Sequence, residues 1–267
     1  MTARALLVRG LLVGLLAGFA TFLVAHQVGE PHVETAIALE EAGAAAEPAE
    51  EHSHEAATDG HTHEDEGTTV SRHNQRTWGL LTGSLVVGTA LGGIVALLAA
   101  AAVGRLGRMT PGQSTATVAL IGFVSFALVP FLKYPATPPA VGNGETIGDR
   151  TSWYFAFLLV SLAFAALSTL LAVRVTENST NGSGTYAGVL SGIGLYVVAM
   201  VVTGQLMPTV NEIGDFPADI LWYFRRASLV TMATMWAVIG IGLTGLIGRL
   251  YRTETARTER RELAASL

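Results

Sequence analysis

Six long apolar runs dominate this sequence and limit what it can fold into. They cover residues 6–25, 79–104, 115–133, 152–174, 186–206 and 228–250. Each has roughly 20 residues or more, the length that an α-helix needs to cross the hydrocarbon core of a bilayer. Because lipid cannot satisfy free backbone groups, such runs must be helical. We therefore predict an all-α, polytopic membrane bundle of about six transmembrane helices.

Composition supports the membrane class. Charged residues make up 14% of the 267-residue chain, against about 25% in an average soluble domain. The first run follows Arg4 and Arg9, a pattern shared with secretory signals. Its length and the lack of a small-residue cleavage site after it favour an uncleaved first helix, which we assign to residues 1–25.

The remaining chain divides by composition into three segments. Residues 26–77 are polar, acidic and rich in Ala and Gly, with too little apolar surface to offset the cost of ordering. We expect an extracytoplasmic loop that is largely disordered, with a fraying helix between Glu34 and Glu51. Residues 78–250 should form a five-helix bundle, and residues 251–267 a charged cytoplasmic tail.

Lysine and arginine predict the orientation of the bundle. With both termini in the cytoplasm, ten of the 16 basic residues lie inside and six outside, which agrees with the positive-inside rule. The same orientation places 17 of the 21 acidic residues outside, where they raise the local concentration of cations.

Prolines and aromatic residues suggest tandem helical hairpins. The third run ends at Val129-Pro130 and the fourth opens at Trp153-Tyr154, whereas the fifth ends at Met207-Pro208 and the sixth opens near Trp222. Three hairpins, each closed by an outer loop, would form a repeat. Interfacial aromatic belts and helix-ending prolines produce similar matches without a repeat.

All seven histidines lie between His26 and His73, in or beside the predicted outer loop. Two His-x-His units stand out, each followed by acidic residues, and neutral imidazole binds Co, Ni, Cu and Zn well. Residues two apart in an extended chain point to the same side, so each unit can reach one ion. The alternative is a solvated acidic loop with incidental histidines. The candidate metal ligands in this loop are His52, His54, His61, His63, Glu64 and Glu66.

A second candidate group lies at the outer end of the first run. If the helix continues, His26 and Glu30 share one face, being four residues apart, and His32 follows closely. These three residues are predicted to take part in a metal path from the loop to the bundle. The alternative is an interfacial histidine beside a helix that ends at Pro31.

The proline-rich stretch 130–142 predicts an extended outer loop, because repeated prolines disfavour helix. It could form a rigid lid over a pore or a passive connector. Lys133 and Arg150 would repel a cation there unless they pair with acidic residues, of which Glu145 and Asp149 are near in sequence.

Three stretches resemble the CbtA family, whose members are predicted cobalt transporter subunits. They are Val129–Gly142 with Glu145–Gly148 and Arg150-Thr151, Gly29–Pro31 with Ala36–Glu40, and Phe224–Ser228 with Trp236. The resemblance implies Co²⁺ uptake across the cytoplasmic membrane. It also implies a small single-span partner, CbtB, with its own histidine motif.

Together these observations predict a non-enzymatic transporter subunit for divalent cobalt in the cell membrane. Its partners would be the metal ion, the lipid bilayer and a CbtB-like subunit, with no tightly bound cofactor. A net charge of −5 argues against nucleic acid, and nucleotide-binding, HExxH and GxSxG motifs are absent. Nickel or zinc as the transported ion stays open, and so does a metal-buffering accessory or sensor protein, favoured by the lack of mid-span Asp, Glu and Lys.

Overall fold

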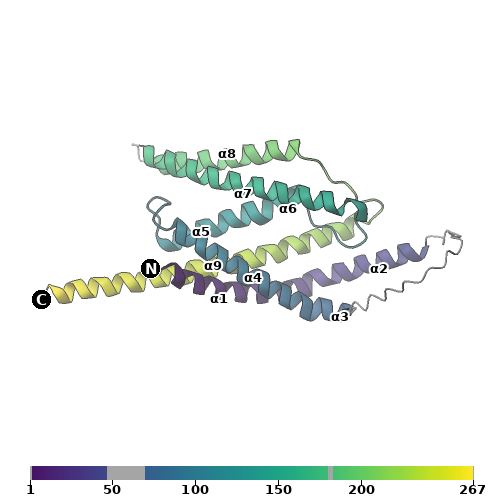
Figure 1. The fold of residues 1–267 in the computed structure, drawn as a ribbon, viewed down its shortest axis with the longest axis horizontal. Coiled ribbons are helices and arrows are strands. Elements are labelled where there is room, and N and C mark those ends of the chain that lie inside the picture. Colours follow the sequence, from purple (N-terminus) through teal and green to yellow (C-terminus); the bar gives the residue numbers. More distant parts are fainter. Residues whose placement is uncertain (1, 47–69, 180–182, 267) are drawn as a thin grey trace, which may run out of the picture.

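The computed structural model describes residues 2–46, 70–179 and 183–266, and these segments form a bundle of long helices (Figure 1). Six helical segments are long and apolar enough to cross a membrane, and no β-strand occurs within the described ranges. The prediction of an all-α membrane bundle with six spans is confirmed. The segments are Ala3–Gly43, Arg72–Ala102, Pro111–Lys133, Gly144–Asn178, Gly184–Leu206 and Ala218–Ala265.

Three of these segments contain a short π-helical turn. The first consists of α1 (Ala3–Val24), the π-turn η1 (Ala25–Gly29) and α2 (Glu30–Ala46). The second consists of α3 (Arg72–Asn74), η2 (Gln75–Gly79) and α4 (Leu80–Ala102). The third consists of α5 (Pro111–Gly122), η3 (Phe123–Leu128) and α6 (Val129–Lys133). After the 3₁₀ turn η4 (Gly144–Thr146) come α7 (Ile147–Asn178), α8 (Gly184–Leu206) and α9 (Ala218–Ala265).

The first helix continues well beyond its apolar run. Residues 26–46, which the sequence analysis assigns to a polar loop with a fraying helix from Glu34, are helical throughout. Pro31 directly follows the π-turn η1, in which hydrogen bonds run five residues back, as from the Glu30 N–H to the Ala25 carbonyl. Alanine and glutamate, which favour helix, make up most of α2 after Thr35. The predicted loop between α2 and α3 falls partly on residues 47–69, which lie outside the described residues.

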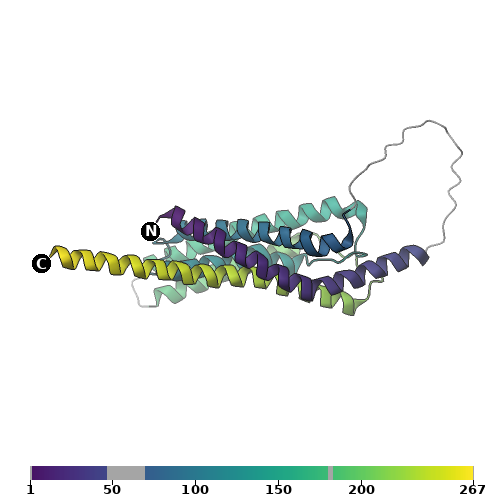
Figure 2. The ribbon, with the colours of Figure 1, turned by 90° about the horizontal axis from the view of Figure 1, so that it is seen from below.

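The bundle has two distinct ends (Figures 1 and 2). Both termini and the turn at residues 103–110 lie at one end, which we call the terminal end. The helix α2, the short helix α3 and the connections at residues 134–143 and 207–217 lie at the other, which we call the loop end. An even number of spans requires this arrangement of the termini.

The tightest helix pair is α1 with α4. Gly10, Gly14 and Gly18 recur every four residues on α1 and face Gly92, Gly88 and Ser84 of the antiparallel α4. A Cβ on Gly14 would lie 2.3 Å from the carbonyl oxygen of Gly88, so only glycine permits this approach. Small residues at this spacing are the usual means by which membrane helices reach close backbone contact.

The next closest pairs are α7 with α8, α1 with α9, and α5 with α9. A Cβ on Gly188 of α8 would lie 2.4 Å from the carbonyl oxygen of Ala172 on α7, and one on Gly122 of α5 would overlap the Trp236 ring of α9. The predicted hairpins paired the first run with the second, the third with the fourth and the fifth with the sixth. The first of these is the observed α1–α4 pair, whereas the fourth run (α7) packs closely on the fifth (α8), and the third (α5) on the sixth (α9).

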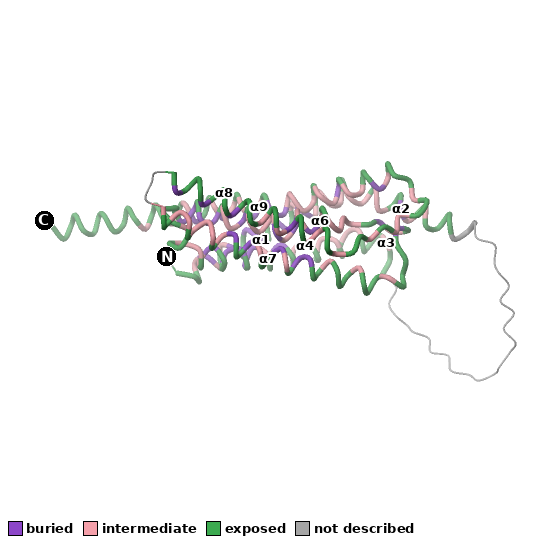
Figure 3. Tube along the Cα trace, turned by 90° about the horizontal axis from the view of Figure 1, so that it is seen from above, coloured by how far each residue is buried: buried purple, intermediate pink, exposed green. Residues whose placement is uncertain are grey.

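A single hydrophobic core lies among four of the six spans. Its buried members come from α1, α4, the α5–η3 segment and α9, and include Val13, Val95, Trp236, Ile239 and Leu243. No residue of α7 or α8 belongs to it. Figure 3 shows buried residues along the middle of the bundle and an exposed extension of α9 at the terminal end. The α7–α8 pair therefore attaches to a four-helix body.

Candidate functional site

The six predicted ligands of the outer loop, His52, His54, His61, His63, Glu64 and Glu66, lie outside the described residues. The helices on either side of them, α2 and α3, both lie at the loop end (Figure 1). The remaining predicted ligands, His26, Glu30 and His32, are described, and each has a protein partner.

His26 lies in the π-turn η1 and packs against the second span. Its ring stacks on Phe22 at 5.6 Å, and its Nδ1 lies 3.2 Å from the carbonyl oxygen of Arg76 in η2. Because a carbonyl oxygen only accepts, Nδ1 must carry the hydrogen and donate it. In the neutral imidazole the lone pair is then on Nε2. Histidine ligands of metals commonly hold this tautomer through the same kind of backbone contact.

Two ion pairs join α2 to the start of the second span. Glu30 pairs with Arg72, and one helical turn later Glu34 pairs with Arg76. The two glutamates lie four positions apart on α2 and the two arginines four positions apart on the second span, so both ion pairs form between one face of each helix. The pairs neutralise both carboxylates and hold α2 against the bundle.

His32 points to a different neighbour. Its ring stacks on that of Tyr223 in α9, with 5.9 Å between centroids and an interplanar angle of 11°. The guanidinium of Arg226 lies 4.9 Å from the Tyr223 centroid, in cation–π range. The structure therefore does not bring His26, Glu30 and His32 together. Within the described part of the chain, no three His, Asp or Glu side chains are grouped to hold a metal ion.

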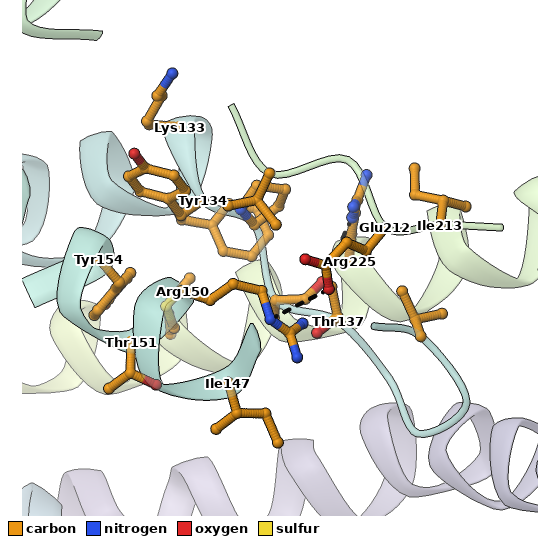
Figure 4. A pocket seen from close by; sticks show the side chains of 16 residues that line it. Lys133, Tyr134, Thr137, Ile147, Arg150, Thr151, Tyr154, Glu212, Ile213 and Arg225 are labelled. Carbon is orange, nitrogen blue, oxygen red and sulfur yellow. Dashed lines mark hydrogen bonds and ion pairs between the residues drawn. The ribbon is translucent and has the colours of Figure 1, made fainter. Parts of the chain in front are cut away.

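A cavity of about 430 Å³ lies at the loop end and is lined in part by the proline-rich segment (Figure 4). Tyr134, Pro135, Ala136 and Thr137 line it from the segment itself, together with residues of α7, α9 and the 207–217 connection. Its charged lining residues are Lys133, Arg150, Glu212 and Arg225. The segment is thus part of a cavity wall.

Glu212 links the two connections at the loop end, residues 134–143 and residues 207–217. Its Oε2 accepts hydrogen bonds from the backbone N–H of Asn143 at 3.0 Å and the hydroxyl of Thr146 at 2.9 Å, and lies 3.5 Å from Nε of Arg150. These contacts favour the ionised form, so the pKa of Glu212 is lowered, chiefly by the Asn143 N–H, then by Thr146, with a smaller contribution from Arg150. The prediction that Arg150 pairs with Glu145 or Asp149 is corrected: its partner is Glu212.

Gly142 is required beside this ion pair. Its φ is +106°, a conformation that glycine adopts without strain. A Cβ there would lie 2.2 Å from Nη1 of Arg150. The guanidinium therefore packs directly on the backbone of the proline-rich segment, and its Nη2 donates to the carbonyl of Asn143 at 3.0 Å.

The ammonium group of Lys133 is also hydrogen-bonded, in this case to backbone carbonyls and not to a carboxylate. Its Nζ donates to the carbonyls of Gly204 at 2.8 Å and Met207 at 3.1 Å, at the C-terminus of α8. A cation there complements the helix dipole. The neighbouring Tyr134 hydroxyl donates to the carbonyl of Pro208 at 2.8 Å, and burial raises the pKa of Tyr134. These contacts fix the α7–α8 pair to the rest of the bundle at the loop end.

A hydrogen-bonded chain lies deeper in the membrane, where η3 precedes Pro130. In η3 each N–H bonds the carbonyl five residues back, as Val129 does with Val124, so the next N–H in this series would meet Ser125. That residue is Pro130, which has none. The Ser161 hydroxyl of α7 donates to the Ser125 carbonyl at 2.7 Å instead, and lies 2.8 Å from the Tyr196 hydroxyl of α8. The cost of the proline is thus met by a neighbouring helix.

The sequence analysis did not predict the partners of these charged side chains. Glu30 and Glu34 are four residues apart, as are Arg72 and Arg76, and complementary charges at this spacing were a usable signal for the two ion pairs. Glu212 offered no such signal, because it lies 62 positions from Arg150 in another connection.

The comparisons with known proteins give one match. The model of a family described as "Probable cobalt transporter subunit (CbtA)" matches residues 3–248, which include all six spans. No curated protein and no solved structure matches the chain.

Proposed function

Because the chain belongs to the CbtA family of probable cobalt transporter subunits, we propose that it carries divalent cobalt into the cell. The family match over 3–248 is the observation that carries this proposal. A multi-pass helical membrane bundle agrees with it. A transporter-subunit family with this fold points away from an enzyme.

The first step of the proposed path is capture by the loop between α2 and α3. His52, His54, His61 and His63, with Glu64 and Glu66, supply imidazole and carboxylate ligands of the kind that divalent Co, Ni and Zn accept. The position of α2 and α3 at the loop end supports this step, since the cavity lies at the same end of the bundle. We expect this step to be a low-affinity collection of the ion, which allows its release.

His26 is the proposed next ligand, since its Nε2 is free to bind while Nδ1 donates to Arg76. Glu30 could bind the same ion only after its ion pair with Arg72 is broken. His32 could do so only after its ring moves away from that of Tyr223. The transfer step therefore requires that the Glu30–Arg72 pair opens. Displacement of arginine by a divalent cation keeps the carboxylate neutralised throughout.

Transport also needs an energy source and an orientation. The sequence has no nucleotide-binding motif, so a gradient or a partner such as a CbtB-like single-span subunit supplies the energy. Both termini would be cytoplasmic and the loop end outside, as the basic residues indicate.

The test is cobalt flux into liposomes that hold the purified chain, driven by an inside-negative potential. Replacing His52, His54, His61 and His63 by Ala should lower influx severalfold at limiting cobalt and leave influx at saturating cobalt unchanged, because the loop acts in collection. Replacing Ser53, Thr58, Thr62 and Thr68 by Ala, in the same loop, is the matched control. Equal influx by both variants at limiting cobalt contradicts capture.

A second function, metal buffering without transport, is favoured by the lack of Asp, Glu and Lys in the middle of the spans. The same liposomes separate the two functions. Cobalt binding by the wild-type chain without influx, in the absence of any partner, supports the accessory protein. Repeating the assay with nickel and zinc identifies the ion that is moved.

A further inference from the structure

A shallow apolar groove runs along the outside of the four-helix body, between α1 and α9. It has a volume of about 340 Å³ and is lined by Val13 and Leu16 of α1 and by Val238, Ile241, Gly242, Gly245 and Leu246 of α9. Arg249 is its only charged lining residue. The groove lies far from the loop-end cavity, because α9 runs from the loop end to the terminal end.

The missing side chain of Gly245 helps to shape the groove. A Cβ on Gly245 would meet no atom within 4 Å, so its position is open space at the surface. Gly242 differs, since a Cβ there would lie 2.7 Å from Cγ1 of Val13 and is excluded by packing. Gly245 therefore leaves room that the bundle itself does not use.

The length of the groove fits one leaflet. From Val238 to Arg249 the helix rises about 16 Å, roughly half of a 30 Å hydrocarbon core. The groove starts near the middle of the span and ends at a cation toward the terminal end. An acyl chain in that leaflet would follow the groove with its head group beside Arg249.

A second arginine flanks the same end. Arg9, Val13 and Leu16 lie at positions i, i+4 and i+7 of α1, on one face of the helix. Nη1 of Arg9 donates to the carbonyl of Ala5 at 2.7 Å, one turn nearer the terminal end, so its guanidinium reaches toward that membrane surface. The guanidinium of Arg249 has no hydrogen bond or ion pair with any residue that the structure describes.

We propose that this groove binds one anionic phospholipid, with an acyl chain along Val13, Ile241 and Gly245 and its phosphate between Arg9 and Arg249. The apolar lining favours an acyl chain, and the two guanidinium groups favour an anionic head group. Basic sites between membrane helices recognise such lipids by this combination. The site is independent of cobalt and of the loop end.

Native mass spectrometry of the full chain in mild detergent tests the proposal. Phosphatidylglycerol, added at increasing concentration, should give a saturating one-lipid adduct, and phosphatidylcholine with the same acyl chains a much weaker one. At about 1 kcal/mol per arginine near a charged lipid surface, Arg9→Gln or Arg249→Gln should weaken phosphatidylglycerol binding roughly fivefold, and both together about 25-fold. Arg257→Gln, in the exposed extension of α9, is the charge-matched control.

A steric variant tests the acyl-chain slot separately. Gly245→Leu fills the groove and should remove the saturable adduct of both lipids. Gly194→Leu on α8, where a Cβ also meets nothing within 4 Å, controls for adding an exposed leucine. Unchanged adducts in Gly245→Leu, equal binding of the two lipids, or a dimer of the chain in place of the lipid adduct would each overturn the proposal. If Gly245→Leu fails to fold, the arginine variants decide the question alone.

Discussion

Glu212 links the two loop-end connections through a single carboxylate oxygen. Because the backbone N–H of Asn143, the hydroxyl of Thr146 and the Arg150 guanidinium all face Oε2, removing the charge weakens three contacts at once. The wall of the loop-end cavity therefore depends on one residue, in a connection of the chain that has no regular secondary structure.

Glu212→Gln should lower the melting temperature of the purified protein at pH 7, and the difference from wild type should vanish in acid. The folded pKa of Glu212 is lowered from its ordinary value of 4.5, so the contribution is fully present above pH 4.5 and is lost as pH falls through the folded value. Melting curves between pH 7 and 3 measure this difference.

Glu145→Gln is the control for that measurement. Glu145 lies in η4, beside the Glu212 contacts at Asn143 and Thr146, and its carboxylate has no hydrogen bond or ion pair with the residues that the structure describes. This variant should match wild type at every pH. A difference between Glu212→Gln and wild type that keeps the same size from pH 7 down to pH 3 would show that the glutamine acts through packing and not through charge.

The ion pair between Arg150 and Glu212 could not be predicted from the sequence. Sequence distance predicts neighbours within one helix or turn, and Glu145 and Asp149 were the natural partners on that basis. Contact between two loops depends on which helix ends lie side by side. The sequence contains no local signal for that placement.

The glycine-lined face of each helix decides which neighbour it packs against most closely. The stripe Gly10, Gly14 and Gly18 meets Gly88 and Gly92 at backbone contact, whereas Gly83 lies on the same helix as Gly88 with no atom within 4 Å of its Cβ position. The abundance of glycine in the spans predicts close packing. It does not identify the partner, because each stripe is compatible with any other small-residue face.

Gly88→Ala should destabilise the protein and Gly83→Ala should not. A Cβ at Gly88 would lie 2.5 Å from the Gly14 carbonyl oxygen, and overpacking of this kind typically costs about 1–3 kcal/mol. At Gly83 the added methyl group meets nothing, and alanine favours helix over glycine by about 1 kcal/mol. Unfolding by denaturant in detergent micelles compares the two, and equal stability would contradict the close packing of α1 on α4.

At the scale of the whole molecule, the number and approximate positions of the spans could be predicted from the apolar runs. The division into a four-helix body and an attached α7–α8 pair could not. Apolar residues facing lipid and apolar residues facing another helix look alike in sequence, since lipid tails are as apolar as leucine. The sequence analysis expects a separate, fraying helix from Glu34, whereas the first helix continues without a break to Ala46, and ion pairs from the distant Arg72 and Arg76 stabilise it.

The proposed orientation predicts opposite labelling at the two ends. The chain has no cysteine, so Glu145→Cys at the loop end and Thr253→Cys at the terminal end each introduce a unique thiol at an exposed position. A membrane-impermeant maleimide should label Glu145→Cys in intact cells and Thr253→Cys only after lysis. The reverse pattern would place the histidine loop in the cytoplasm and contradict uptake through it.

The length of α9 has a mechanical consequence. Its 48 residues form one continuous helix of about 72 Å, more than twice the thickness of a bilayer core. Arg225 and Leu221 lie near its first turns and a solvent-exposed rod projects from its far end. A tilt of this helix about a pivot within the membrane moves its two ends in opposite directions. A change at the cavity wall that tilted α9 in this way would displace its exposed extension on the other side of the membrane.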